Sequence, residues 1–181
     1  ENTTITANQS FEDVSLFVDG NGSSNNVYLA SNGVTIKASA GAEVGSEGIL
    51  NGVGYVIVDL TILNGMIAAQ DDITTVVTSK ITDMSNLFHN NTTFNQDISS
   101  WDVSKVTYMN WMFDNASSFN QNLSDWNVSN VTKMGGMFAG TTSFNQDLSS
   151  WSVSNVIDCN KFSINAEKWI LPKPNFTNCT E

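Results

Sequence analysis

The side chains in this sequence that could do chemistry recur every 25 residues. Asp97, Asn122 and Asp147 form one such column. Acidic oxygens in register suit Ca²⁺, which takes about 6–8 oxygen ligands. The column is broken by Asn122, and no glycine-rich calcium-binding pattern accompanies it. The sequence therefore predicts no metal site and no cofactor.

A catalytic role finds little support in the sequence. His89 is the single histidine, and its counterparts 25 and 50 residues later are Asp114 and Ala139. No Gly-x-Ser-x-Gly, phosphate-loop or His-Glu-x-x-His pattern is present. We expect His89 to be a solvated surface residue and the protein not to be an enzyme.

An Asn-Gln pair precedes each member of the acidic column, at Asn95-Gln96, Asn120-Gln121 and Asn145-Gln146. One interpretation is a polar ladder that lines a ligand groove. The other is a stack of amides that satisfy backbone groups where the chain turns, since buried polar groups need partners. The second interpretation is favoured.

These residues belong to a unit that begins at Ile81, Val106 and Val131, and begins again at Val156. Its apolar positions recur in register, which is typical of repeats that bury a face on their neighbours. The columns are Met84/Met109/Met134/Cys159, Phe88/Phe113/Phe138, Phe94/Phe119/Phe144, Ile98/Leu123/Leu148, Trp101/Trp126/Trp151 and Val103/Val128/Val153. We expect all of them, the tryptophans included, to be core, because a row of exposed indoles would favour aggregation.

Two aromatic residues of the second unit do not recur. Trp111 aligns with Asn86 and Gly136, so the repeat does not require an aromatic there. Trp111 either faces outward or fills a local gap. We take Tyr108 and Trp111 as the candidate ligand or partner contact surface.

The chain ahead of the repeats has β character. Alternating apolar residues predict a strand over 11–18, and further short strands are expected at 27–29 and 34–37. Asn51-Gly52 predicts a hairpin turn between 48–50 and 55–58, because both residues tolerate positive φ. Asp59 then caps an expected helix over 60–69, and 73–80 is strand-like. These elements would cover the open end of the first repeat.

The repeat units Ile81-Thr-Asp-Met-Ser-Asn-Leu-Phe and Phe94-Asn-Gln-Asp-Ile-Ser-Ser-Trp-Asp-Val-Ser resemble those of BspA-like leucine-rich-repeat surface proteins. The resemblance extends over about residues 29–163. It implies a secreted or cell-surface protein, often an adhesion or interaction module, without a shared catalytic activity.

The expected fold is therefore an α/β repeat. It is a leucine-rich-repeat-like solenoid with one short parallel strand per repeat and short helical turns on the other side. The expected divisions are an N-terminal extension (1–25), a β/α cap (26–80), the solenoid (81–163) and a C-terminal cap (164–181).

Cysteine content and charge predict where the protein works and what it avoids. Cys159 and Cys179 either form one disulfide or remain two buried free thiols, and the disulfide is favoured. Such a bond would indicate an oxidising compartment and would hold the C-terminal cap in place. The net charge of -11 argues against nucleic acid, and no apolar run is long enough for a membrane span. Without an initiator Met, the chain begins like a secreted product whose signal has been removed.

These observations predict a non-enzymatic extracellular or cell-surface protein. In one hypothesis it is a structural surface component, with self-assembly as an option. In the alternative it is an adhesin module that binds a glycan or a protein through the variable repeat positions.

Overall fold

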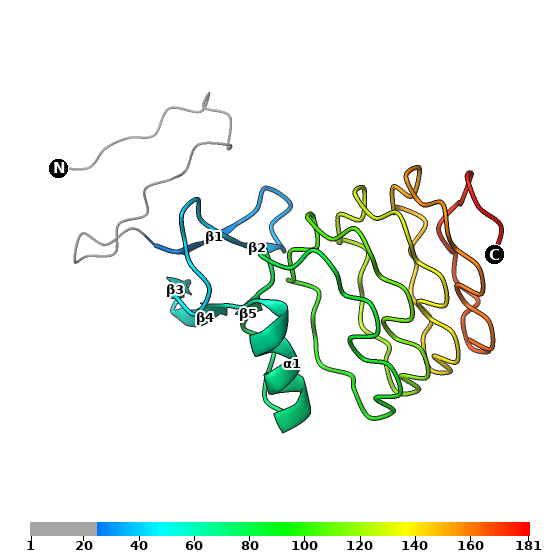
Figure 1. Cartoon of the computed structure of the whole chain (residues 1–181), viewed down its shortest axis with the longest axis horizontal. Coiled ribbons are helices and arrows are strands. Elements are labelled where there is room, and N and C mark those ends of the chain that lie inside the picture. The colour runs from blue at the N-terminus through cyan, green and yellow to red at the C-terminus, as the bar shows by residue number, and fades with distance from the viewer. Residues whose placement is uncertain (1–24) are drawn as a thin grey trace.

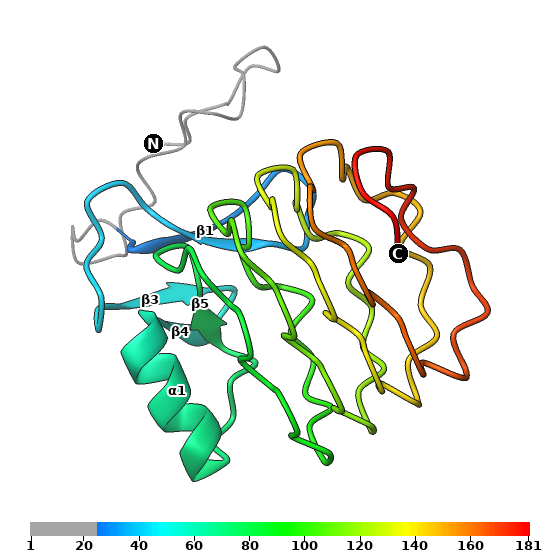
Figure 2. The ribbon, with the colours of Figure 1, turned by 45° about the vertical axis from the view of Figure 1, so that its right-hand side comes forward.

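The computed structural model describes residues 25–181, and the strand expected over 11–18 lies outside that range. Two small sheets and one helix come first, and the repeat units follow as loops that run side by side away from them (Figures 1 and 2). The C-terminus lies at the far end of these loops (Figure 1).

The first sheet pairs β1 (Val27–Leu29) with β2 (Ile36–Ala38) antiparallel. The second has the order β3-β4-β5, with β3 (Glu47–Leu50) and β4 (Val53–Ile57) antiparallel and β5 (Val76–Val77) parallel to β4. Between β3 and β4, Asn51 and Gly52 have φ of 53° and 81°. Positive φ at both central positions is what a type I′ turn requires. The predicted hairpin is confirmed.

Helix α1 (Leu60–Ala69) is also confirmed with its cap. The Asp59 side chain accepts a hydrogen bond from the Ile62 backbone N–H at 2.9 Å, which satisfies one of the free amides of the first turn. The helix ends at Gln70, whose φ of 60° lies in the left-handed region. Leu63 is its fully buried residue.

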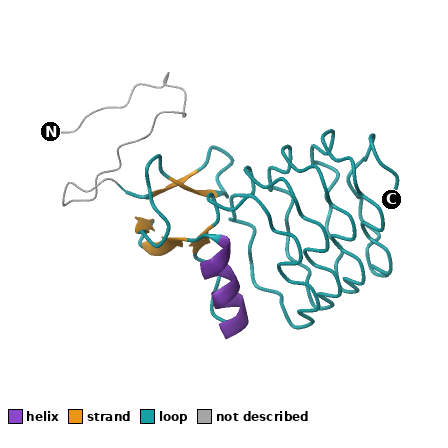
Figure 3. Ribbon diagram, viewed as in Figure 1, coloured by secondary structure: helices purple, strands orange, loops and turns teal. Residues whose placement is uncertain are grey.

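The expected α/β repeat solenoid is wrong. Named strands in the described residues form small antiparallel and mixed sheets at the N-terminal side, with one short helix, and the repeat units are drawn wholly as loops and turns (Figure 3). Between units, β-type pairing consists of single-residue parallel bridges, which join Asp83, Tyr108, Lys133 and Asp158 in turn.

The backbone of each unit explains why strands and helical turns do not form. Two residues four apart adopt left-handed φ, for example Trp111 at 58° and Asn115 at 57°. Each such residue interrupts both an extended strand and a right-handed helix. The other units repeat this feature at Asn86/Asn90, Gly136/Gly140 and Lys161/Asn165.

The units are nevertheless held in register by backbone hydrogen bonds. In unit one (from Ile81), Met84 N–H donates to the Tyr108 carbonyl of unit two (from Val106) at 2.9 Å, and Thr107 N–H donates back to the Thr82 carbonyl at 2.8 Å. Equivalent bonds join unit two to unit three (from Val131) and unit three to unit four (from Val156).

The apolar columns are buried, as expected. The methionine, phenylalanine and tryptophan columns form one core that extends from α1 to Trp169. Each indole N–H of the tryptophan column donates to a carbonyl of the preceding segment, such as Trp126 Nε1 to Ile98 O at 3.1 Å. The ladder fixes the indoles without leaving a buried polar group unpaired.

The N-terminal part is fastened to unit one by polar contacts. Ile36 N–H in β2 donates to the Ser100 carbonyl at 2.8 Å. The buried Asp102 carboxylate accepts from Ser79 Oγ at 2.6 Å and lies 3.7 Å from Lys37 Nζ. β2, the segment after β5 and unit one therefore pack as a continuous structure.

Candidate functional site

Tyr108 and Trp111 both lie at the surface of unit two, with exposed fractions of 42% and 36%. We call these two residues the aromatic patch. Tyr108 belongs to the row of parallel bridges, so neighbouring side chains in its column are set by the register of the units. Met109, between them in sequence, is buried and anchors the segment in the core.

Both aromatic side chains lean on unit three. A Cβ built on Gly136 would fall 2.1 Å from Trp111 Cε3, so the indole occupies the space that any other residue at 136 would need. Lys133 Nζ lies 5.4 Å from the centroid of the Tyr108 ring, within reach of a cation–π interaction. Lys133 and Gly136 of unit three therefore support the aromatic patch.

Sequence reasoning selected Tyr108 and Trp111 but missed these two supporting residues. The signal was present, because Gly136 stands in the same column as Trp111 and one unit later. A glycine beside a bulky residue in the next coil marks a close approach of side chain to backbone. The charges around the patch are mixed: Asp83 and Asp158 occupy the same column as Tyr108 and Lys133.

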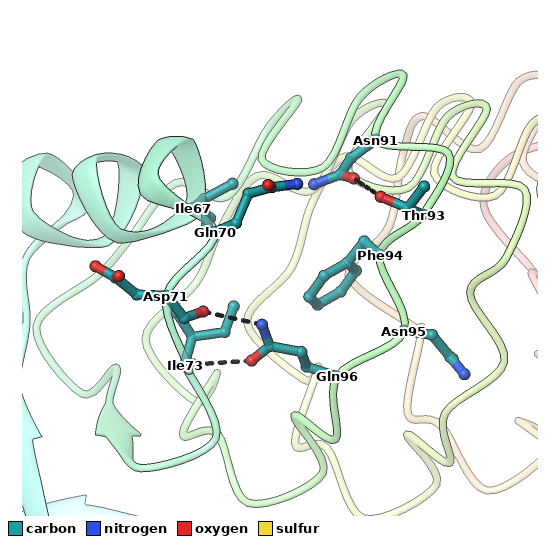
Figure 4. Close-up of a pocket in the computed structure, with 9 residues that line it drawn as sticks. All are labelled: Ile67, Gln70, Asp71, Ile73, Asn91, Thr93, Phe94, Asn95 and Gln96. Atoms are coloured by element: carbon teal, nitrogen blue, oxygen red, sulfur yellow. Dashed lines mark hydrogen bonds between the residues drawn. The ribbon is translucent and has the colours of Figure 1, made fainter.

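The Asn-Gln pairs hold the units together, as the favoured interpretation expected. Asn120 N–H donates to Asn95 Oδ1 at 2.9 Å, and Gln121 Nε2 donates to the Asn95 carbonyl at 2.9 Å. Asn145 and Gln146 repeat both bonds one unit later. These amides join neighbouring units, and Asn95 and Gln96 of unit one also line a pocket beside α1 (Figure 4).

The hydrogen bonds to the asparagine side chains also continue past residue 163, the predicted end of the repeats. Ile170 N–H donates to Asn145 Oδ1 at 2.9 Å, which is the bond that Asn120 and Asn145 make in units two and three. Trp169 takes the place of the column phenylalanine, with its ring centroid 4.7 Å from that of Phe144.

The acidic column closes local turns. Asp97 accepts from Ser99 N–H at 3.0 Å, and Asp147 accepts from Ser149 Oγ at 2.7 Å and its N–H at 2.9 Å. The Ser149 hydroxyl, and after it the Ser149 N–H, lowers the pKa of Asp147 from its ordinary value of 3.8. Within residues 25–181, no three acidic, histidine or cysteine side chains are grouped to hold a metal ion.

His89 does not stand alone at the surface. Its Nδ1 lies 2.9 Å from Asp114 Oδ2 of unit two, and its Nε2 lies 2.7 Å from the Asn90 side-chain amide. The imidazole is thus one more link between neighbouring units.

The disulfide is confirmed. Cys159 and Cys179 are bonded with an S–S distance of 2.06 Å and a Cα–Cα distance of 5.8 Å. Cys159 is fully buried at the end of the methionine column. The tail is held further by Phe176, whose ring packs edge-on against Phe162 with centroids 4.9 Å apart.

Over the part of the chain that the structure covers, no helix is both long and apolar enough to cross a bilayer.

Comparison with known proteins gives one family. The family described as "Mycoplasma protein of unknown function, DUF285" matches residues 61–171, which is more than half of the chain, so the chain belongs to that family. Neither a curated protein nor a solved structure matches.

Proposed function

We propose that this member of the DUF285 family is a non-enzymatic extracellular protein that serves as a structural surface component and associates through its aromatic patch. The observation that carries the proposal is the exposure of Tyr108 and Trp111 on one unit, each braced by unit three. Most of the polar chemistry of the repeats is committed to joining units, whereas these two side chains are available for contact.

The chemistry of the patch favours a protein partner, and a second copy of the chain is the simplest one. Tryptophan and tyrosine are enriched at the energetic centres of protein interfaces because they bury much area with few rotatable bonds. Asp83 and Lys133 occupy the bridge positions on either side of Tyr108, so the charges beside the patch do not select a strongly acidic or basic partner. The disulfide supports an oxidising, extracellular setting.

Net charge makes the proposal more specific. At -11, two copies repel each other at long range, and salt screens that repulsion. Association through an aromatic contact is therefore expected to strengthen as salt rises from about 0.05 M to about 0.5 M.

Native mass measurement over a range of concentrations tests the proposal. Wild type is expected to form oligomers, and Y108S/W111N to remain a single chain. Asparagine suits position 111 because Asn86 holds the same left-handed backbone in unit one. Y28S is the control, since Tyr28 in β1 has a similar exposed fraction of 37%. A wild-type protein that stays monomeric at every salt and concentration contradicts the proposal, as does an oligomer that Y108S/W111N leaves intact.

A further inference from the structure

The row of parallel bridges carries a fixed order of charges across the aromatic patch. Asp83, Tyr108 and Lys133 follow one another in this row, one from each of units one, two and three, and all three are exposed. The units run side by side (Figure 2) and are joined by equivalent backbone hydrogen bonds. Asp83 and Lys133 therefore flank Tyr108 on opposite sides, each one unit away.

Both charges remain available for a contact with another molecule. The Asp83 carboxylate accepts a hydrogen bond from Ser85 N–H at 2.8 Å, and the Lys133 ammonium group lies 5.4 Å from the centroid of the Tyr108 ring. Neither side chain takes part in an ion pair within residues 25–181. The row thus presents a negative charge, an aromatic ring and a positive charge in that order.

This order distinguishes between the two ways in which two copies can meet face to face through the row. In both, a two-fold axis lies in the plane of the contact. If the axis runs along the row, each residue meets its own counterpart, and like charges repel at both Asp83 and Lys133. If the axis crosses the row at Tyr108, the second row runs the opposite way. Asp83 of each copy then faces Lys133 of the other.

The crossing point at Tyr108 is also favoured over its neighbours. An axis that crosses between units two and three would bring Asp83 opposite Asp158, and an axis at Lys133 would bring that lysine opposite itself. An axis along unit two instead brings Tyr108 and Trp111 opposite their own counterparts. The aromatic patches then meet at the centre of the contact, with an opposite-charge pair on each side.

We propose that two copies of the chain form a closed dimer whose two-fold axis crosses the row at Tyr108. Asp83 of each copy pairs with Lys133 of the other, and these pairs set the register in which the aromatic patches meet. Because such a contact uses the same face of both copies, assembly through it stops at two chains. The inference rests on the proposed function, since it specifies how the aromatic patch self-associates.

Charge reversal tests this register with side chains that the repeat already carries at the same position. D83K installs the residue of unit three, and K133D installs the residue of units one and four. Each variant replaces two attractive pairs by two repulsive ones. In sedimentation velocity at fixed salt, the Kd of the dimer is expected to rise about tenfold or more.

Matched controls separate the register from net charge. D125K and K168D make the same two changes of net charge at exposed positions outside the row. Their Kd is expected to stay within about threefold of the wild-type value, since an isolated surface charge contributes little. The double variant D83K/K133D restores opposite charges at both places and is expected to dimerise as wild type does.

Mixing the two single variants gives the most specific result. Alone, each has like charges opposite each other, but one chain of D83K and one of K133D form two attractive pairs. Native mass spectrometry with one variant isotope-labelled is therefore expected to show dimers that contain one chain of each kind, in excess over either homodimer.

The outcomes separate this inference from the proposed function. Wild type that stays a single chain contradicts both. Wild-type dimers that D83K and K133D leave intact overturn the charge register alone, as does a mixture that forms no mixed dimer. Wild-type particles larger than two chains that Y108S/W111N abolishes overturn the closed dimer, while association through the aromatic patch stands.

Discussion

The contact between Trp111 and Gly136 allows the support of the aromatic patch to be measured. In Gly136→Ala, the new Cβ would lie 2.1 Å from Trp111 Cε3 and 2.3 Å from Cζ3. Carbon atoms pack at about 3.5–4.0 Å, so the indole has to move by about 1.5 Å or more. Alanine must also adopt the φ of 63° that glycine holds, which costs about 1 kcal/mol.

Adding the lost packing of a largely buried indole face, we expect G136A to lower the free energy of unfolding by about 2–3 kcal/mol. For a chain of this length that corresponds to a fall in Tm of about 5–10 °C. In a W111N background no indole obstructs the new methyl group, so G136A should cost only about 1 kcal/mol there. The coupling energy between the two positions is then about 1–2 kcal/mol.

Urea unfolding of wild type, both single variants and the double variant gives this coupling directly. G33A is the matched control, because Gly33 has φ of 73° and open space around its missing Cβ. It should cost about 1 kcal/mol, as backbone strain alone does. A coupling below about 0.4 kcal/mol, the range of independent sites, would refute the claim that Trp111 rests on Gly136.

Other contacts lead to three further predictions. Replacing both Cys159 and Cys179 by alanine should destabilise the chain by about 3 kcal/mol, because the bond closes a loop with a sequence separation of 20; reduction of wild type should give the same loss in urea melts, and equal stability would contradict it. W126F should lower stability by about 2–4 kcal/mol in the same assay, since it leaves the buried Ile98 carbonyl without its indole donor. A loss below about 0.5 kcal/mol would contradict a stabilising role for the indole hydrogen bonds of the tryptophan column. Because its pKa is lowered in the folded state, Asp147 stabilises the fold at pH values above the unfolded-state pKa near 3.9, and this stabilisation is lost as pH falls through the folded-state pKa. The difference in Tm between wild type and S149A should therefore stay constant at about pH 5–7 and shrink below about pH 4.

Much of the N-terminal part could be predicted because its signals are local. Asn51-Gly52 specifies a hairpin by the φ values that those residues tolerate, and Asp59 specifies a helix start through one side-chain bond. The burial of the 25-residue columns could also be predicted, since an apolar side chain that recurs in register has no other role as consistent as packing on its neighbour.

The backbone of the repeats could not be read from the same columns. An apolar side chain in register shows which residues face inward, but it does not show the path of the chain between them. That path depends on the left-handed residues, and position 111 illustrates the difficulty. Its column contains Asn86, Trp111, Gly136 and Lys161, all with φ near 60°. Only the asparagine and glycine are typical of that region.

The same column shows why only part of the candidate contact surface could be predicted from the sequence. A tryptophan in left-handed conformation carries backbone strain, which persists where the surroundings enforce it. Here the left-handed φ belongs to the repeat, because Asn86 and Lys161 share it, and the missing side chain of Gly136 leaves the space in which the indole lies. The strain of Trp111 therefore comes with the repeat, and the close approach of units two and three decides where the indole lies. Residue type alone marked Trp111 as unusual, and the 25-residue register was needed to find the glycine that makes its position possible.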